Sequence, residues 1–447
     1  MTKRKYKPKS LRVCHQDAAG IDIGADEHWV AVPPDRDEDP IRKFGTFTSD
    51  LQRLADWLRQ CGVRTVAMES TGVYWVPIYE LLEQCGLEVL LVNAAHARNV
   101  PGRKSDVIDC QWLQELHTFG LLRASFRPEA KITELRTYTR HRQTLIEGSA
   151  QQIQRMQKAL DQMNVQVHHV LSDLTSKTGM AIVRDIVAGQ HDPEVLAQHR
   201  DTRCHASKEV IIEALRGHYK PEHLFSLGQA LSLYDVFSQH IRACDDRIET
   251  VLTTLAKHFP DPGTPKQRAK FRPVGNQIAI DIRNPLQRIL SGVDIQTIVG
   301  IGPLTALNIL SETGYDMSRW PTEKHFTSWL NFAPGTHISG GRRLSSRRPP
   351  SKSRAGLILR QAASSLGRTQ TALGAFYRRI AARRSKAIAI VATARKLACA
   401  YYRLLRYGGQ YVERGAAAAD HDYQQRRLDS LKRQAKTLGY NLQPVPT

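Results

Sequence analysis

Several common signatures are missing from this chain of 447 residues, and each absence removes a class of protein. No apolar run approaches the ~20 residues that a bilayer-spanning helix needs. The basic start MTKRKYKPKS leads into no apolar signal core, so we expect neither a membrane protein nor a secreted one. The seven cysteines are scattered and form no CxxC pair, which argues against a zinc knuckle and against a disulfide scaffold. The expected compartment is the reducing cytoplasm.

Acidic residues are absent from one long segment. The whole chain has 64 Lys plus Arg against 43 Asp plus Glu, a net charge of +21. Residues 324–412 contain 18 Lys or Arg and no Asp or Glu, so nearly all of the excess lies there. Such a concentrated positive field favours a polyanionic partner, because phosphate neutralisation and counterion release drive nucleic-acid binding. An acidic membrane surface is the alternative partner.

The length predicts two or three domains, and residues 1–125 have the pattern of a mixed α/β domain. A hairpin turning around Gly24–Glu27 comes first, and the third strand RKFGTF follows. A helix (LQRLADWLRQ), a strand (VRTVAM), a helix (VYWVPIYELLEQCG), a strand (LEVLLV) and a final helix from near Ser105 complete the order. This order is typical of a ribonuclease-H-like fold.

A helical region is predicted over residues 126–290. Eleven positions from Ile132 to Val167 alternate three and four apart, and eight of them are apolar. This spacing predicts a coiled-coil seam with three polar interruptions, paired within the chain or between copies. The alternative is a long helix packed on its own domain. The predicted seam positions are Ile132, Leu135, Thr139, Arg142, Ile146, Ser149, Ile153, Met156, Leu160, Met163 and Val167.

A basic, mostly helical C-terminal domain is predicted over residues 291–412, followed by a polar tail at 413–447 that we interpret as a frayed helix or disorder. The sequence IQTIVGIGPLTALNILSETG has the layout of a helix-hairpin-helix with its turn at Gly300 and Gly302. In such hairpins, backbone amides approach a phosphate at a helix N-terminus. A simple packing turn is the alternative.

Four acids of the first domain are candidates for one metal site. Asp22 lies within the first strand, between Ile21 and Ile23, and alternation places its carboxylate on the face opposite theirs. Glu69 ends the strand VRTVAM, while Asp106 and Asp109 share one face of the last helix. A ribonuclease-H-like sheet gathers such acids, and four close anions require cations. Oxygen-only ligation favours Mg²⁺, with two ions expected for phosphodiester cleavage. Each acid alone could instead be a solvated or helix-capping residue.

The motifs GIDIG, MESTGVYW, LLVNAAHARNVPGRKSDVID, GIGPLTA and HISGGR together resemble the insertion-sequence-110 transposases. These are also called DEDD transposases or bridge-RNA-guided recombinases. The resemblance implies a RuvC-like domain whose catalytic, metal-binding acids are Asp22, Glu69, Asp106 and Asp109. It also implies a catalytic serine at Ser339, in the SGG motif of a C-terminal transposase domain. The sequence departs from the family at Cys110, where the second acid pair ends in alanine, and in a longer middle region.

The surroundings of Ser339 suit a phosphate independently of the family. Glycines permit close backbone approach and arginines bind phosphate oxygens bidentately. On the residues alone, Ser345, Ser346, Ser351 and Ser353 are equal candidates, and a phosphate-binding loop without a nucleophile is the better interpretation. The candidate nucleic-acid-binding residues of this segment are Gly340, Gly341, Arg342, Arg343, Arg347 and Arg348.

The favoured function is a recombinase that excises and inserts a mobile DNA element, with donor and target DNA as partners. The family implies a structured guide RNA, whose base pairing would read sequence while the protein reads shape and phosphates. Because four strands are cut and rejoined, we expect a homo-oligomer, a dimer that forms a tetramer on DNA. The alternative enzyme is a Holliday-junction-type endonuclease that uses metal-activated water. A nucleic-acid-binding protein on an inactive nuclease domain is the non-enzymatic alternative.

Overall fold

The structure is a computed structural model that describes residues 12–70, 72–92, 106–261, 263, 271–272, 275–345, 353–408 and 416–443. Within these ranges, the side chains of residues 106–108, 337 and 416–420 are not described. The chain divides into two compact units, Met1–Arg127 and Pro128–Thr447. The finer division at residues 125, 290 and 412 stays a prediction. All seven cysteines are free thiols, and no described helix combines the length and apolar character needed to cross a membrane.

The first unit contains a five-stranded mixed sheet in the order β3-β2-β1-β4-β5. Strands β1, β2 and β3 pair antiparallel, whereas β1, β4 and β5 run parallel. The predicted element order is confirmed, and the sheet is consistent with a ribonuclease-H- or RuvC-like domain. The elements are β1 (Ala18–Ile23), β2 (Glu27–Ala31), β3 (Ile41–Gly45), α1 (Thr48–Gln60), β4 (Thr65–Glu69), α2 (Trp75–Gln84), β5 (Glu88–Val92) and α4 (Asp106–Thr118).

The core of this unit lies between one face of the sheet and helices α1 and α2. Alternate residues of β1 and β4, such as Ile21 and Met68, are fully buried against apolar side chains of α1 and α2 such as Leu54 and Ile78. Since successive side chains of a strand point to opposite faces, the residues between them face the other side. That second face is the one that α4 contacts.

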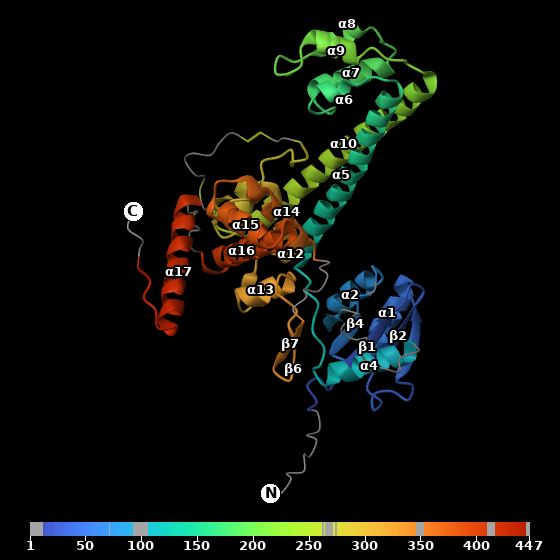
Figure 1. Cartoon of the computed structure of the whole chain (residues 1–447). Helices are drawn as coiled ribbons and strands as arrows, with labels where there is room; N and C mark the ends of the chain where they lie inside the picture. Colours follow the sequence, from blue (N-terminus) through green and yellow to red (C-terminus); the bar gives the residue numbers. More distant parts are fainter. Residues whose placement is uncertain are drawn as a thin grey trace. The chain divides into compact units, whose positions relative to one another are not determined.

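Among its described residues, the second unit is helical apart from one two-stranded hairpin. Figure 1 shows two long helices, α5 and α10, side by side and antiparallel, with the short helices α6 to α9 at their far end. The elements are α5 (Ala130–Gln162), α6 (Val167–Val170), α7 (Lys177–Val187), α8 (Pro193–Leu196), α9 (Lys208–Ala214), α10 (Pro221–Ala256), α11 (Arg283–Ile289), α12 (Pro303–Thr313), α13 (Glu323–Trp329), β6 (His337–Ser339), β7 (Arg342–Ser345), α14 (Arg354–Ser365), α15 (Ala372–Arg383), α16 (Lys386–Tyr407) and α17 (Ala416–Thr437).

The predicted seam runs along the buried face of α5, with Met163 and Val167 just beyond the end of that helix. Nine of its eleven positions are buried and the other two, Ile146 and Ile153, are half-buried. The partner is α10 of the same chain. The structure therefore gives the seam an intramolecular partner, but it does not confirm a coiled coil. The tail, predicted as a frayed helix or disorder, contains the 22-residue helix α17, which contacts α15.

One polar interruption of the seam, Arg142, forms a buried ion pair with Asp245 of α10. The guanidinium also donates to the carbonyl oxygens of Asn276 and Gln277. The second carboxylate oxygen of Asp245 accepts from the amide of Ala279 at 2.9 Å. The pair thus ties α5 and α10 to the segment 276–279 and has hydrogen-bonding partners on both sides.

We predict that Arg142→Ala lowers the free energy of unfolding by about 3–5 kcal/mol, because it leaves the buried Asp245 carboxylate without its countercharge. The matched control is Arg184→Ala, which breaks a bidentate pair with Asp235 at 2.6 and 2.7 Å. The side chains of that pair are 48% and 41% exposed, against 5% and 2% for Arg142 and Asp245. The control should cost about 1 kcal/mol or less. Equal costs in urea unfolding would show that the buried pair has no special structural role.

Candidate active site

Two of the predicted acids lie at the same level on adjacent parallel strands. The register of β1 on β4 pairs Gly20 with Ala67 and Ile21 with Met68, so Asp22 and Glu69 occupy the next position. Both point to the face that α4 covers, because Ile21 and Met68 point into the opposite core. Glu69 is buried and Asp22 half-buried. The predicted orientation of Asp22 is therefore confirmed.

Helix α4 brings a third acid to this face, and a glycine permits its close approach. A Cβ built on Gly20 would lie 2.3 Å from the carbonyl oxygen of Cys110 and 2.4 Å from the amide nitrogen of Gln114. The backbones of strand and helix are therefore in direct contact two residues before Asp22. Asp109, half-buried, precedes Cys110 on the helix.

The electrostatics of Cys110 reflect both its burial and the two acids near it. Burial raises the pKa of the Cys110 thiol to about 12, and the charges of Asp22 and Asp109 contribute to the rise. Both carboxylates are therefore near enough to this thiol to disfavour its ionised form. Cys110 is therefore a neutral, buried contact between α4 and β1.

A buried histidine anchors the other end of α4. The Nε2 atom of His117 is 2.8 Å from Oγ1 of Thr65, at the start of β4, and its ring stacks on His15 with centroids 4.8 Å apart. Burial lowers the pKa of His117 to about 4, with a further contribution from His15. The imidazole is therefore neutral at physiological pH and acts as a hydrogen-bonding anchor.

The donor chemistry of the site fits a hard divalent cation, since all the predicted ligands are carboxylate oxygens. Among the described side chains, no group of three acidic, histidine or cysteine residues is close enough to hold an ion. The fourth predicted acid, Asp106, begins α4 and its side chain lies outside the described residues. The segment 93–105, between β5 and α4, is also outside them.

The predicted serine lies in the second unit, on the β6–β7 hairpin. Ser339 ends β6 and pairs with Arg342, the first residue of β7. Gly340 and Gly341 form the two-residue turn with φ of +54° and +75°. Two consecutive positive φ angles are what a tight type I′ turn requires, and glycine supplies them without strain. The side chains of Ser339, Arg342 and Arg343 are all exposed.

Comparison with known families matches both units. Residues 19–165 match a DEDD transposase family model of IS110 type. Residues 294–378 match the transposase family IS116/IS110/IS902. The chain belongs to the IS110 family of transposases. The resemblance seen in the sequence motifs is thus confirmed, and the two matches cover the regions of the carboxylates and of the serine. A search among curated proteins found no match.

The remaining predicted nucleic-acid-binding residues of the transposase are two arginines and the two glycines of the predicted helix-hairpin-helix. Arg347 and Arg348 lie outside the described residues. The helix-hairpin-helix is not confirmed, because a single 3₁₀ turn, Ile295–Thr297, stands where its first helix was predicted. Gly300 has φ of +90° and lies so close to Leu366 that a Cβ would meet that side chain at 3.0 Å. Gly302 is the N-cap residue of α12.

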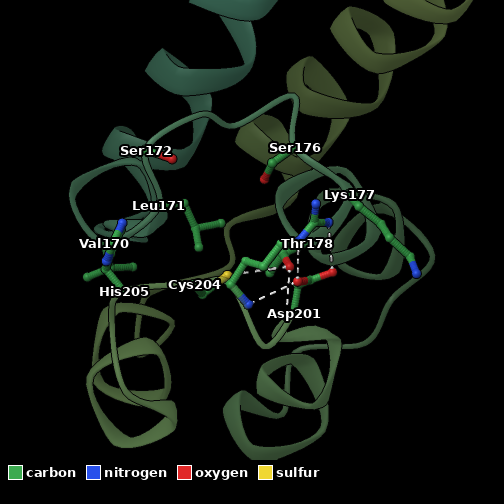
Figure 2. Close-up of a pocket in the computed structure, with 10 residues that line it drawn as sticks. Val170, Leu171, Ser172, Ser176, Lys177, Thr178, Asp201, Cys204 and His205 are labelled. Carbon is green, nitrogen blue, oxygen red and sulfur yellow. Dashed lines mark hydrogen bonds and ion pairs between the residues drawn. The ribbon is translucent and has the colours of Figure 1, made fainter. Parts of the chain in front are cut away.

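A separate polar pocket lies among the short helices of the middle region. It has a volume of about 300 Å³ and lies beside the N-terminus of α7 (Figure 2). The Thr178 hydroxyl donates to the carbonyl oxygen of His199 and accepts from the amide of Asp201. The Asp201 carboxylate is paired with Arg203. These bonds hold the loop after residue 199 against α7.

Gly20, Thr65 and His117 are positioning residues that sequence reasoning missed. The available signal was a glycine inside a strand, which often marks a close backbone approach. The partners of that approach, Cys110 and Gln114, are 90 and 94 residues further along the chain, so the pattern alone did not identify them.

We predict that Gly20→Ala destabilises the transposase by about 3 kcal/mol, because its new methyl group meets backbone atoms that cannot rotate away. The rate of DNA cleavage should fall even at a temperature where the variant is fully folded, because the displaced helix α4 carries Asp109. The matched control is Gly228→Ala, within α10, where the new Cβ would be 3.5 Å from Val187 Cγ1. The control should be neutral or stabilising by about 1 kcal/mol. Urea unfolding and cleavage at a temperature where both variants are folded provide the test; wild-type behaviour of Gly20→Ala would contradict the account.

Proposed function

We propose that this transposase cuts and rejoins DNA with a carboxylate-held metal site and a serine nucleophile. The observation that supports the proposal is the position of Asp22 and Glu69 at one level on the sheet face that α4, the helix of Asp109, contacts at Gly20, in a chain of a transposase family. A phosphodiester is an anion, and three carboxylates at one place repel it unless cations are bound there. An all-carboxylate site is therefore more easily explained by a metal-dependent reaction than by direct acid–base catalysis.

Asp22, Glu69, Asp106 and Asp109 are the proposed ligands of Mg²⁺, with two ions per site. Bound ions supply positive charge to the phosphate oxygens and to the oxygens that enter and leave. The contribution of the chain is to hold the ligands rigidly. Asp22 and Glu69 lie on central, hydrogen-bonded strands, while Asp109 lies on a helix fixed by the Gly20 contact and the His117–Thr65 bond.

Ser339 is the proposed nucleophile. Its Oγ attacks phosphorus, its proton leaves to solvent or a base, the bond to the 3′-oxygen breaks, and that oxygen takes up a proton. One phosphodiester is exchanged for another, so rejoining by the reverse reaction needs no ATP. The exposed turn supports this role, because a hydroxyl beside Gly340 and Gly341 meets little steric hindrance and Arg342 lies directly opposite.

The partners of the reaction are part of the same proposal. The acid-free segment 324–412 suits donor and target DNA and also a structured guide RNA, because both present phosphates. Two duplexes contribute four strands to an exchange, so several active sites are needed. We propose a homo-oligomer, dimeric and then tetrameric on DNA, acting in the cytoplasm.

We predict that Asp22→Asn lowers the rate of strand cleavage by about 100-fold or more. The variant loses one ligand charge, and a bound metal stabilises the charge of the transition state by several kcal/mol. DNA affinity should change by about threefold or less, because the basic segment belongs to the other unit. Chelation with EDTA should reproduce the effect. The control is Asp26→Asn, an exposed acid in the turn after β1. Full cleavage by Asp22→Asn would exclude this site.

The serine predicts that Ser339→Ala abolishes cleavage and strand exchange while DNA affinity is retained, since only one exposed oxygen is removed. Ser345→Ala, at the far end of the same hairpin, is the control and should reduce activity by about twofold or less. Gel assays on DNA carrying the element's ends measure both. If Ser339→Ala still cuts strands but cannot rejoin them, the water-dependent endonuclease replaces the recombinase.

A further inference from the structure

Helix α16 carries a second apolar stripe that its neighbours cover only in part. One face is buried in the unit through residues such as Ala394, Leu397 and Tyr401. A different stripe includes Ile388, Val391 and Ala392, at helical spacing. Ile388 is 52% exposed.

This stripe forms the floor of a groove of about 690 Å³. Its other walls are Phe376 of α15 and the loop residues Phe332 and Pro334. The volume lies within the range of about 300–1,000 Å³ that is typical of small-ligand pockets. The groove therefore offers aromatic and aliphatic surface to a flat, apolar group.

The rim of the groove is cationic. Arg395 and Lys396 lie on it, and the Lys396 ammonium is 4.2 Å from the centroid of the Phe376 ring. Partial desolvation lowers the pKa of Lys396, and the charges of Arg426 and Arg379 add to the effect. A cluster of like charges beside an apolar surface is complementary to a ligand that is flat on one side and anionic on the other.

The groove is also close to the hairpin. Pro334 lines it and Ser339 follows five residues later, so their Cα atoms are at most about 18 Å apart. A DNA strand rises about 3.4 Å per nucleotide, so this distance corresponds to about five nucleotides or fewer. A strand with its phosphate at Ser339 therefore has bases within reach of the groove.

We propose that the groove binds an unstacked nucleobase of the DNA strand held at the hairpin, with Arg395 and Lys396 on its phosphates. Phe376 provides the aromatic surface for stacking, which tolerates any base because every base has a π-face. Holding a base out of the stack would unpair the duplex near the cleavage point and expose the strand for exchange. The inference rests on the proposed function for its choice of DNA.

The test is photocrosslinking of the full-length transposase to a single-stranded 12-mer of thymidine with 5-iodouracil at one central position. We expect the crosslink to map by mass spectrometry to the peptide that contains Phe376. Ile388→Asp should reduce the crosslink yield about fivefold or more, because it places a carboxylate on the groove floor. Crosslinks confined to the hairpin or to α14 would overturn the proposal.

The matched control is Leu357→Asp. Leu357 is 48% exposed, lies in the same acid-free segment and, like Ile388, is in the first turn of a helix capped by serine. Both aspartates are therefore compatible with folding, and the melting temperatures check this. The control should change the yield by less than twofold, and an equal loss in both variants would show that only net charge matters.

Two further outcomes separate this inference from its alternatives. A changed molecular mass of Ile388→Asp in light scattering, with an unchanged crosslink, would make the groove a contact between copies and overturn the proposal. The assay needs no cleavage, so it can be run on Ser339→Ala as well. If Ser339→Ala or Asp22→Asn still recombines DNA, the proposed function is refuted. If the same variant still forms the groove crosslink, the base-binding groove is nevertheless supported.

Discussion

The contact between α4 and β1 at Gly20 is the constraint on which the carboxylate site depends. Any side chain at this position would separate the helix from the strand, because the nearest atoms are backbone atoms of Cys110 and Gln114. The contact costs no side-chain entropy and brings α4, the helix of Asp109, against the strand of Asp22. The His117–Thr65 hydrogen bond fixes the other end of the helix, so that repulsion between the carboxylates does not displace it.

In the second unit, polar contacts hold the two long helices α5 and α10 in register. Apolar burial alone would allow α5 and α10 to slide, since similar side chains recur along the seam. The buried Arg142–Asp245 pair and its backbone partners fit only one alignment. Near the start of α5, Arg140 donates two hydrogen bonds of 2.7 and 2.8 Å to the carboxylate of Glu312 in α12. These bonds join the α5–α10 pair to the helices that precede β6.

The sequence was sufficient for features that depend on local periodicity. The sequence of strands and helices along the first unit, the face of Asp22 and the buried face of α5 follow from alternation and helical spacing, and each is confirmed. Features that depend on distant partners were not predictable in this way. The pattern of α5 could not identify α10 as its partner, and Gly20 gave no indication that α4 would cover it. The missing first helix before Gly300 has a local cause: Asp294 caps a single 3₁₀ turn, after which Ile298 is extended.

The central claim is that Ser339 forms a covalent bond with DNA. The most direct measurement is mass spectrometry of the protein after reaction with its DNA, denaturation and nuclease digestion. The account predicts a nucleotide joined through a 5′-phosphate to Ser339, formed only when divalent metal is present. An adduct on another serine, or cleaved DNA with no adduct at all, would contradict it.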